Sequence, residues 1–183
     1  MLNINRMLPV AALFSLASPL WFPQPLQRTY TAKGRTIHYI VISFKPPLQI
    51  TPDNGGLNQD TAINCVRLYW SRLSNLDIKG AAQLYLDPQR EIDVRMKYKE
   101  RVGDKVFREM HSKVFASTSF THELVIGTDH ALMSEKYGGT MILLRLQDRK
   151  YFLESIDNAK REQQAQDLMT LVNAHGDGKL DFE

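Results

Sequence analysis

Apolar and polar positions alternate with different periods along the chain, and the period of each stretch predicts the element it forms. Residues 36–44 are dense in β-branched and aromatic side chains, a composition typical of a strand. Because proline has no amide hydrogen for a β-ladder, Lys45-Pro46-Pro47 is expected to end this strand. The polar stretch 19–34 is expected to be a linker, and the stretch 51–59, which contains Pro, Asn and two Gly, an open loop.

Two helices are expected next. Apolar residues recur at every third or fourth position over 62–74, which predicts an amphipathic helix with Asp60 or Thr61 as its N-cap. Asp77 is expected to cap a second, short helix, and Asp87-Pro88 to close it.

A third helix is expected to start within 89–98 and to run to about Ala116. Charged residues of both signs fill most of its positions, which indicates a solvated face with local ion pairs. Its buried face is expected to be one apolar line at steps of four residues: Tyr98, Val102, Val106, Met110 and Val114.

Beyond Ala116 the pattern predicts four short strands. They are expected over 120–126, 131–137, 141–146 and 150–156, separated by turns of two to four residues, and such spacing is typical of an antiparallel meander. Residues 159–172 are expected to form a C-terminal helix or a frayed tail.

The order of these elements predicts an α+β fold class, with N-terminal helices packed on an antiparallel sheet. We expect residues 1–27 to be a signal peptide or N-terminal anchor with a linker, and 28–59 an appended strand and loop. Residues 60–158 would then be the core domain, and 159–183 a C-terminal helix or flexible tail. The pattern leaves open whether a partner or the chain's own helices cover the second face of the sheet.

Composition narrows the class of protein. Of the 183 residues, 43% are apolar and 23% charged, which argues against wholesale disorder and against a protein with several membrane spans. A net charge of +3 is too small to indicate nucleic-acid binding. Cys65, the single cysteine, cannot form an internal disulfide and is expected to be a buried thiol.

The N-terminus has the features of an export signal. Arg6 precedes an apolar stretch over residues 7–16, which is too short to span a bilayer comfortably. Because Pro19 directly follows the small residues at 17–18, cleavage is expected further along, or the segment is retained as an inner-membrane anchor with Trp21 at the interface. The protein is thus expected to be periplasmic or secreted. The alternative is a buried N-terminal helix of a cytoplasmic protein.

The histidines, the C-terminal run and the glycine-rich segments are the candidates for a metal, cofactor or catalytic motif. His122 and His130 are expected to be exposed turn residues rather than a metal site, and no histidine pair has the spacing of a zinc site. The run 173–183 resembles a calcium loop, but it lacks the twelfth ligand and is interpreted as a flexible acidic tail. No phosphate loop or nucleophile elbow is present. No cofactor, no metal and no catalytic residue is assigned.

Residues 60–156 resemble the nuclear transport factor 2-like superfamily, which includes SnoaL-like proteins. The features that carry this resemblance are Tyr69-Trp70 in the first helix, the run Asn75 to Ala82, and the closing run Leu146 to Ile156. The resemblance implies a cystatin-like cone, in which a curved antiparallel sheet wraps around N-terminal helices. It does not decide the function, because this superfold hosts enzymes, binding modules and parts of secretion machines.

Two functions are left open. The first is an exported envelope protein that binds a small apolar ligand or a protein partner without catalysis, with a possible homodimer or membrane tether. The second is a cofactor-independent isomerase, dehydratase or cyclase for a small apolar molecule, which needs an acid or base tuned by an apolar pocket. An ion pair between Arg145 and Glu154 on adjacent strands is expected in either case. The candidates for the pocket are Tyr98, Glu135, Tyr137, Arg145 and Glu154, and an enzyme would add Asp93.

Overall fold

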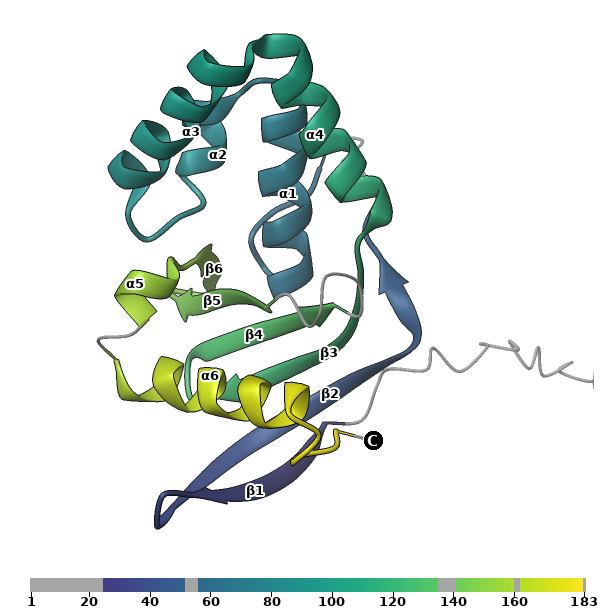
Figure 1. Ribbon diagram of the computed structural model, residues 1–183, viewed down its shortest axis with the longest axis vertical. Helices are drawn as coiled ribbons and strands as arrows, with labels where there is room; N and C mark the ends of the chain where they lie inside the picture. Colours follow the sequence, from purple (N-terminus) through teal and green to yellow (C-terminus); the bar gives the residue numbers. More distant parts are fainter. Residues whose placement is uncertain (1–24, 52–55, 135–140, 160–161, 183) are drawn as a thin grey trace, which may run out of the picture.

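The computed structural model describes residues 25–51, 56–134, 141–159 and 162–182, and it confirms the α+β class (Figure 1). In chain order the elements are β1 (Leu26–Ala32), β2 (Arg35–Gln49), α1 (Ala62–Ser74), α2 (Ile78–Ala82), α3 (Pro88–Val102), α4 (Asp104–Ser117), β3 (Ser119–Ile126), β4 (Asp129–Ser134), β5 (Met141–Gln147), β6 (Lys150–Leu153), α5 (Ile156–Ala159) and α6 (Gln163–Gly176).

The strands form one antiparallel sheet in which they follow each other in sequence order from β1 to β6. The predicted meander over β3, β4, β5 and β6 is confirmed, while the turn expected at Gly138-Gly139 lies outside the described residues. The last strand is shorter than expected, because β6 ends at Leu153 and α5 begins at Ile156.

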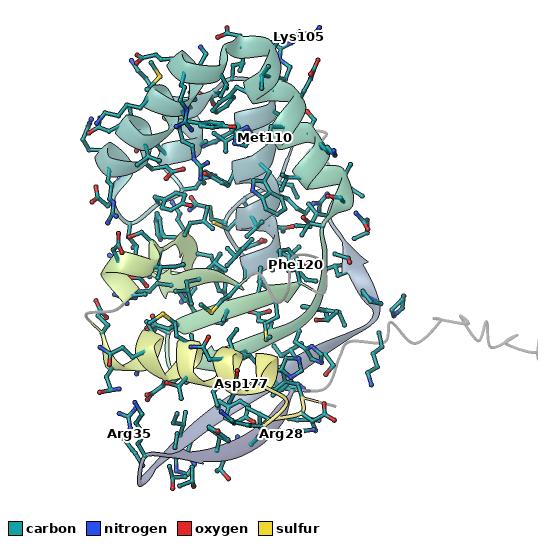
Figure 2. The ribbon with its side chains drawn as sticks, in the orientation of Figure 1. Arg28, Arg35, Lys105, Met110, Phe120 and Asp177 are labelled. Carbon is teal, nitrogen blue, oxygen red and sulfur yellow. The ribbon has the colours of Figure 1, made fainter. Side chains whose placement is uncertain are left out.

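Helices lie on both faces of this sheet. On one face α1, α2 and α4 bury an apolar core around Leu73, Phe107 and Phe120, and Figure 2 labels Phe120 between the helices and the sheet. On the other face α6 packs across β3 and β4 through Leu168 and Leu171 (Figure 1). The chain's own C-terminal helix therefore covers the sheet face whose cover the sequence pattern left open.

The interpretation of 19–34 as a linker is wrong for Leu26–Ala32, which forms β1 and pairs with β2 along its whole length. The connecting residues Lys33 and Gly34 both have positive φ, at 51° and 75°. This combination gives a two-residue turn whose twist matches that of the flanking strands. The hairpin lies at the edge of the sheet, where alternate side chains face solvent, so its strand β1 carries few of the apolar residues that mark buried strands.

The prolines do not end β2. Ser43 pairs with His122 and Leu48 pairs with Phe120. Five positions along β2 therefore oppose two positions along β3, and the pairing is interrupted between Ser43 and Leu48. The extra residues of β2 form an irregular bulge that contains Pro46, and regular pairing resumes with Leu48 and Gln49. A bulge is a place where a strand tolerates proline, because the bulged residues do not donate to the ladder.

Side-chain caps start the first three helices. Thr61 Oγ1 accepts a hydrogen bond from the amide of Asn64 at 3.1 Å, and Asp77 Oδ1 accepts one from Gly80 at 2.9 Å, as the pattern predicted. Asp87-Pro88 begins α3 rather than closing the preceding unit, since proline at the first helical position sacrifices no helical hydrogen bond.

The expected third helix is two helices, α3 and α4. Gly103 separates them with φ 80° and ψ 160°, a backbone region that is almost restricted to glycine. The apolar line from Tyr98 to Val114 therefore does not lie on one face, and Val106 is 49% exposed. The pairing of charges along these helices is confirmed, with Lys99 and Asp104 3.2 Å apart across the break.

The C-terminal run is not a flexible tail. Phe182 is fully buried, and its ring lies 4.5 Å from that of His175 and 5.6 Å from that of His122. His175 Nδ1 also lies 2.9 Å from the carbonyl oxygen of Leu180, which folds the end of the chain back onto α6. One aromatic residue in a polar run is thus enough to dock the segment, because the burial of its ring offsets the conformational entropy lost when the segment becomes ordered.

Two further predictions concern burial and membrane insertion. Cys65 is fully buried, as predicted, and its thiol lies 3.1 Å from the carbonyl oxygen of Tyr151. Burial raises the pKa of this thiol to about 12. Within the described ranges, no helix is long and apolar enough to cross a membrane.

Candidate functional site

A groove of about 320 Å³ lies between the start of α3 and the edge of the sheet at β5 and β6; we call it the α3 groove. Its exposed lining residues are two apolar ones, Val94 at 50% and Ile156 at 52% exposure, and two charged ones, Asp87 and Arg90. Two carboxylates, Glu91 and Glu154, also line it and are only 7% and 8% exposed. A concave site with apolar walls and a few buried polar groups is the usual form of a small-molecule site.

Helix α3 supplies one wall of the groove. Asp87 Oδ1 accepts a hydrogen bond from the amide of Arg90 at 3.2 Å and fixes where the helix begins. Glu91 and Val94 are three residues apart, so they lie on the same face of α3, one turn from each other. The cap thereby fixes the positions of Glu91 and Val94 in the lining of the groove.

The end of β6 supplies the opposite wall. Leu153 donates its amide to the carbonyl of Leu84 at 2.7 Å, and accepts from the amide of Leu86 at 3.0 Å. Glu154 then donates its amide to the carbonyl of Leu143 at 2.9 Å. These backbone bonds hold the segment before α3 against the sheet edge, so both walls belong to one fixed frame.

Glu91 is held by a buried hydrogen-bond network inside the helical layer. The hydroxyl of Tyr69 donates to Glu91 Oε1, and Arg95 Nε donates to the same oxygen at 2.5 Å. The Arg95 guanidinium also lies 5.8 Å from the centre of the Tyr69 ring. The centres of the Tyr69 and Tyr85 rings are 5.3 Å apart. A carboxylate this buried is stable only with such partners, because an unpaired buried charge is very costly.

Burial raises the pKa of both tyrosines at this network. For Tyr69 desolvation is the largest cause, and the nearby Tyr85 and Glu91 raise the pKa further. For Tyr85 burial is again the first cause, followed by the negative charge of Glu91. Both hydroxyls therefore remain protonated hydrogen-bond donors throughout the physiological pH range.

Glu154 lies in a second ion-pair network, centred on Arg145. The predicted pair of Arg145 and Glu154 is confirmed, with Nη2 3.3 Å from Oε2. The same guanidinium binds Asp129 at 2.8 Å and Glu162 at 2.7 Å. Burial raises the pKa of Glu154, and the positive charge of Arg145 opposes this rise.

Of the three pocket candidates that lie within the described residues, Glu154 lines the α3 groove, with Arg145 as its ion-pair partner. Tyr98 is partly buried between α3 and α4, where its hydroxyl donates to Met110 Sδ at 2.8 Å. Glu135 and Tyr137 lie outside the described residues.

Glu91 and Arg95 were expected on a solvated face, and the structure places them in the buried network. Glu91 precedes Tyr98 by seven residues, so both lie on the same face of α3, and Tyr98 was already expected to be buried. This seven-residue spacing is the signal that could have identified Glu91. Asp93 is exposed, and it accepts a hydrogen bond from Gln89 at 2.9 Å.

The prediction that His122 and His130 are exposed is wrong, since they are 9% and 6% exposed. His130 Nδ1 lies 2.7 Å from Glu123 Oε1, and its ring packs 4.8 Å from that of Tyr151. Across the described part of the chain, no three His, Cys, Asp or Glu side chains converge as a metal site would require.

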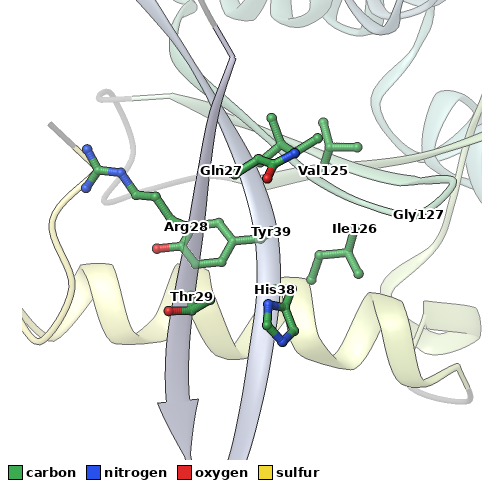
Figure 3. Close-up of a pocket in the computed structure, with 9 residues that line it drawn as sticks. Gln27, Arg28, Thr29, His38, Tyr39, Val125, Ile126 and Gly127 are labelled. Carbon is green, nitrogen blue, oxygen red and sulfur yellow. The ribbon is translucent and has the colours of Figure 1, made fainter.

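A second, larger depression of about 550 Å³ lies over β1, β2 and β3 (Figure 3). Its lining includes Arg28, Thr29, His38 and Tyr39. Of these, only Tyr39 is buried, and its ring packs edge-on against Phe182 at 6.3 Å. The depression combines exposed polar side chains of an edge hairpin, and its described lining residues include no carboxylate, so the α3 groove is the better candidate site.

Comparisons with protein-family models, with curated proteins and with solved structures give no match.

Proposed function

We propose that the protein binds a small, mainly apolar molecule in the α3 groove and does not transform it. The observation that carries this proposal is the half-exposed apolar rim of Val94 and Ile156 above a floor with two buried carboxylates. Isolated exposed apolar residues are common on proteins, but two that line the same groove leave an apolar surface that a ligand can cover.

The volume of the groove limits the size of the ligand, and the exposed area of its apolar residues limits the affinity. A volume of about 320 Å³ lies at the lower end of the range for small-molecule sites. Full burial of a large apolar side chain contributes about 1.5–3 kcal/mol, so covering the exposed halves of Val94 and Ile156 contributes roughly 2 kcal/mol in total. This corresponds to about a thirtyfold effect on the dissociation constant.

The proposal includes three expectations that rest on the sequence. The first is the cone of the nuclear transport factor 2-like superfamily, supported by the order of helices and meander. The second is export to the periplasm or the medium, with residues 1–27 as signal or inner-membrane tether. The third is a homodimer, which has less support because α6 occupies one sheet face. Intact mass of the protein purified from the cell envelope tests export, by reporting where the N-terminus begins, and native mass spectrometry of the same sample reports the oligomeric state.

The binding proposal is tested with a neutral fluorescent probe, N-phenyl-1-naphthylamine, and two substitutions that make the rim polar, Val94→Ser and Ile156→Ser. We expect the double variant to weaken probe binding about thirtyfold. Val106→Ser is the matched control, because Val106 is also a helical valine, is 49% exposed and does not line the groove. Equal loss of binding in the control and the rim variant would refute the assignment of the probe site to the groove.

A catalytic function has one observation in its favour. Glu154 lines the groove, and its burial raises its pKa, which is the property that a general acid or base for an apolar substrate needs. This second candidate is a cofactor-independent isomerase, dehydratase or cyclase. It predicts that a molecule retained by the purified protein incorporates deuterium from heavy water, and that Glu154→Gln abolishes the incorporation. A retained molecule that stays unlabelled would contradict it.

A further inference from the structure

The chemistry of the groove floor indicates what kind of apolar ligand it binds; this inference rests on the proposed function. Both donors to Glu91, the Tyr69 hydroxyl and the Arg95 guanidinium, bind Oε1. Among the described residues no donor binds Glu91 Oε2, although the side chain lines the groove and is 7% exposed. The buried side-chain atoms without a partner do not include Oε2, so this oxygen reaches solvent, where it can accept a hydrogen bond from a ligand.

The second carboxylate is incompletely compensated. Arg145 serves Asp129, Glu154 and Glu162 together, and its contacts with Glu154 are the longest of the three, at 3.3 and 3.4 Å. Charge-assisted hydrogen bonds are usually about 2.7–2.9 Å long. Glu154 therefore receives the smallest part of the stabilisation that this guanidinium provides.

The charged groups around the groove carry a net negative charge. Among the described lining residues the cation is Arg90, which is bound to Asp157, with Ser155 Oγ 3.3 Å away. Apart from this pair, the described ionised groups that line the groove or belong to its ion-pair networks are two guanidinium groups and five carboxylates: Arg95 and Arg145 against Asp87, Glu91, Asp129, Glu154 and Glu162. A local excess of negative charge on a chain of net charge +3 favours a cationic ligand over a neutral or anionic one.

We propose that the natural ligand is an organic cation with an apolar body and an ammonium group. The ammonium donates to Glu91 Oε2 and balances the charge of Glu154, while the apolar body lies between Val94 and Ile156. A bare metal ion does not fit this site. Metal ions such as Ca²⁺ need six or more oxygen ligands, and the apolar rim would contribute nothing to their binding.

The test compares three probes with the same six-carbon chain: hexylamine, which is cationic at neutral pH, 1-hexanol and hexanoate. Isothermal titration calorimetry on the full chain is expected to show that hexylammonium binds about tenfold more tightly than 1-hexanol, the effect of one hydrogen bond to a charged group, and that hexanoate binds most weakly. Glu91→Gln is expected to remove this preference while 1-hexanol binding persists. Glu154→Gln is a second variant that reduces the preference without disturbing the Tyr69 network. Glu109→Gln is the matched control, because this glutamate is 65% exposed on α4 and lies outside the groove.

The outcomes separate this inference from the proposed function. Equal binding of hexylammonium and 1-hexanol, with both weakened by the rim variant, would overturn the cationic ligand and leave the apolar site standing. A preference for hexylammonium that Glu109→Gln reduces as much as Glu91→Gln does would reflect general surface charge and would also overturn it. Failure of all three probes to bind would refute the function itself.

Discussion

Removal of the Tyr69 hydroxyl tests the buried network that holds Glu91 in the α3 groove. Tyr69→Phe keeps the ring and its packing against Tyr85, and it deletes one of the two donors to Glu91 Oε1. A hydrogen bond to a charged group contributes about 1.5–3 kcal/mol, and Arg95 remains to bind the carboxylate. We therefore expect the free energy of unfolding to fall by about 2 kcal/mol.

Urea denaturation followed by circular dichroism measures this change. For a slope of about 2 kcal/mol per molar urea, the midpoint is expected to fall by about 1 M. Tyr98→Phe is the control, because the Tyr98 hydroxyl donates to a thioether sulfur, Met110 Sδ, which is a weak acceptor. The control is expected to lose less than about 1 kcal/mol.

A double-mutant cycle isolates the interaction itself. In a Glu91→Gln background the acceptor is neutral, so Tyr69→Phe is expected to cost about 1 kcal/mol or less. The reasoning would be refuted if Tyr69→Phe cost no more than Tyr98→Phe, or if its cost were the same with and without the Glu91 carboxylate.

Three further predictions concern stability. Burial lowers the pKa of His111 from its ordinary value of 6.5, so the unfolded chain binds a proton at this residue more readily than the folded chain does. The stability that this group contributes is therefore complete above about pH 6.5. It falls as the pH drops toward the folded pKa, by at most about 1.4 kcal/mol per pH unit. In urea titrations across that range His111→Gln should remove this component, and His38→Gln, at an exposed position, should keep it. Phe182→Ala is expected to cost about 3 kcal/mol, the low end for a buried phenylalanine because the chain end can relax, as calorimetry would measure. Gly103→Ala is expected to cost about 1–3 kcal/mol in urea denaturation because of its φ of 80°, whereas Gly176→Ala should cost less.

Each of these predictions has a result that would contradict it. For His111, it is a stability profile that His111→Gln leaves unchanged. For Phe182, a loss below about 0.5 kcal/mol would mean that the C-terminal run is not docked. For Gly103, equal costs at the two glycines would mean that α3 and α4 join without a glycine-specific backbone.

Local signals predicted the elements that depend on a few neighbouring residues. The caps at Thr61 and Asp77, and the short turns from β3 to β4 and from β5 to β6, were expected, because side chains near each boundary determine it. Gly103 was missed because the four-residue spacing of apolar side chains continues across it. Periodicity reports which faces are apolar and does not report the backbone angle of one residue.

Elements stabilised by distant partners were predicted less well. Strand β1 is polar and lies at a sheet edge, so its own composition resembles a linker, and its pairing with β2 determines its structure. Phe182 docks only because β2, β3 and α6 together form a site for its ring. No pattern within either segment contains this information.

For the candidate site, the sequence predicted one network and missed the other. The pair of Arg145 and Glu154 follows from cross-strand neighbours in a meander, so it could be predicted from strand spacing. The network of Glu91 joins α1 and α3, and its burial depends on how these helices pack. A charged residue in a mixed-charge helix is usually solvated, which is why this one was misassigned.

Mapping amide chemical shifts during a titration with 1-hexanol tests most directly whether the α3 groove is the binding site. The account predicts that the largest changes occur at residues that line the groove, among them Tyr85, Val94, Ile142 and Ile156. Largest changes over the depression of β1, β2 and β3, or no saturable change anywhere, would contradict it.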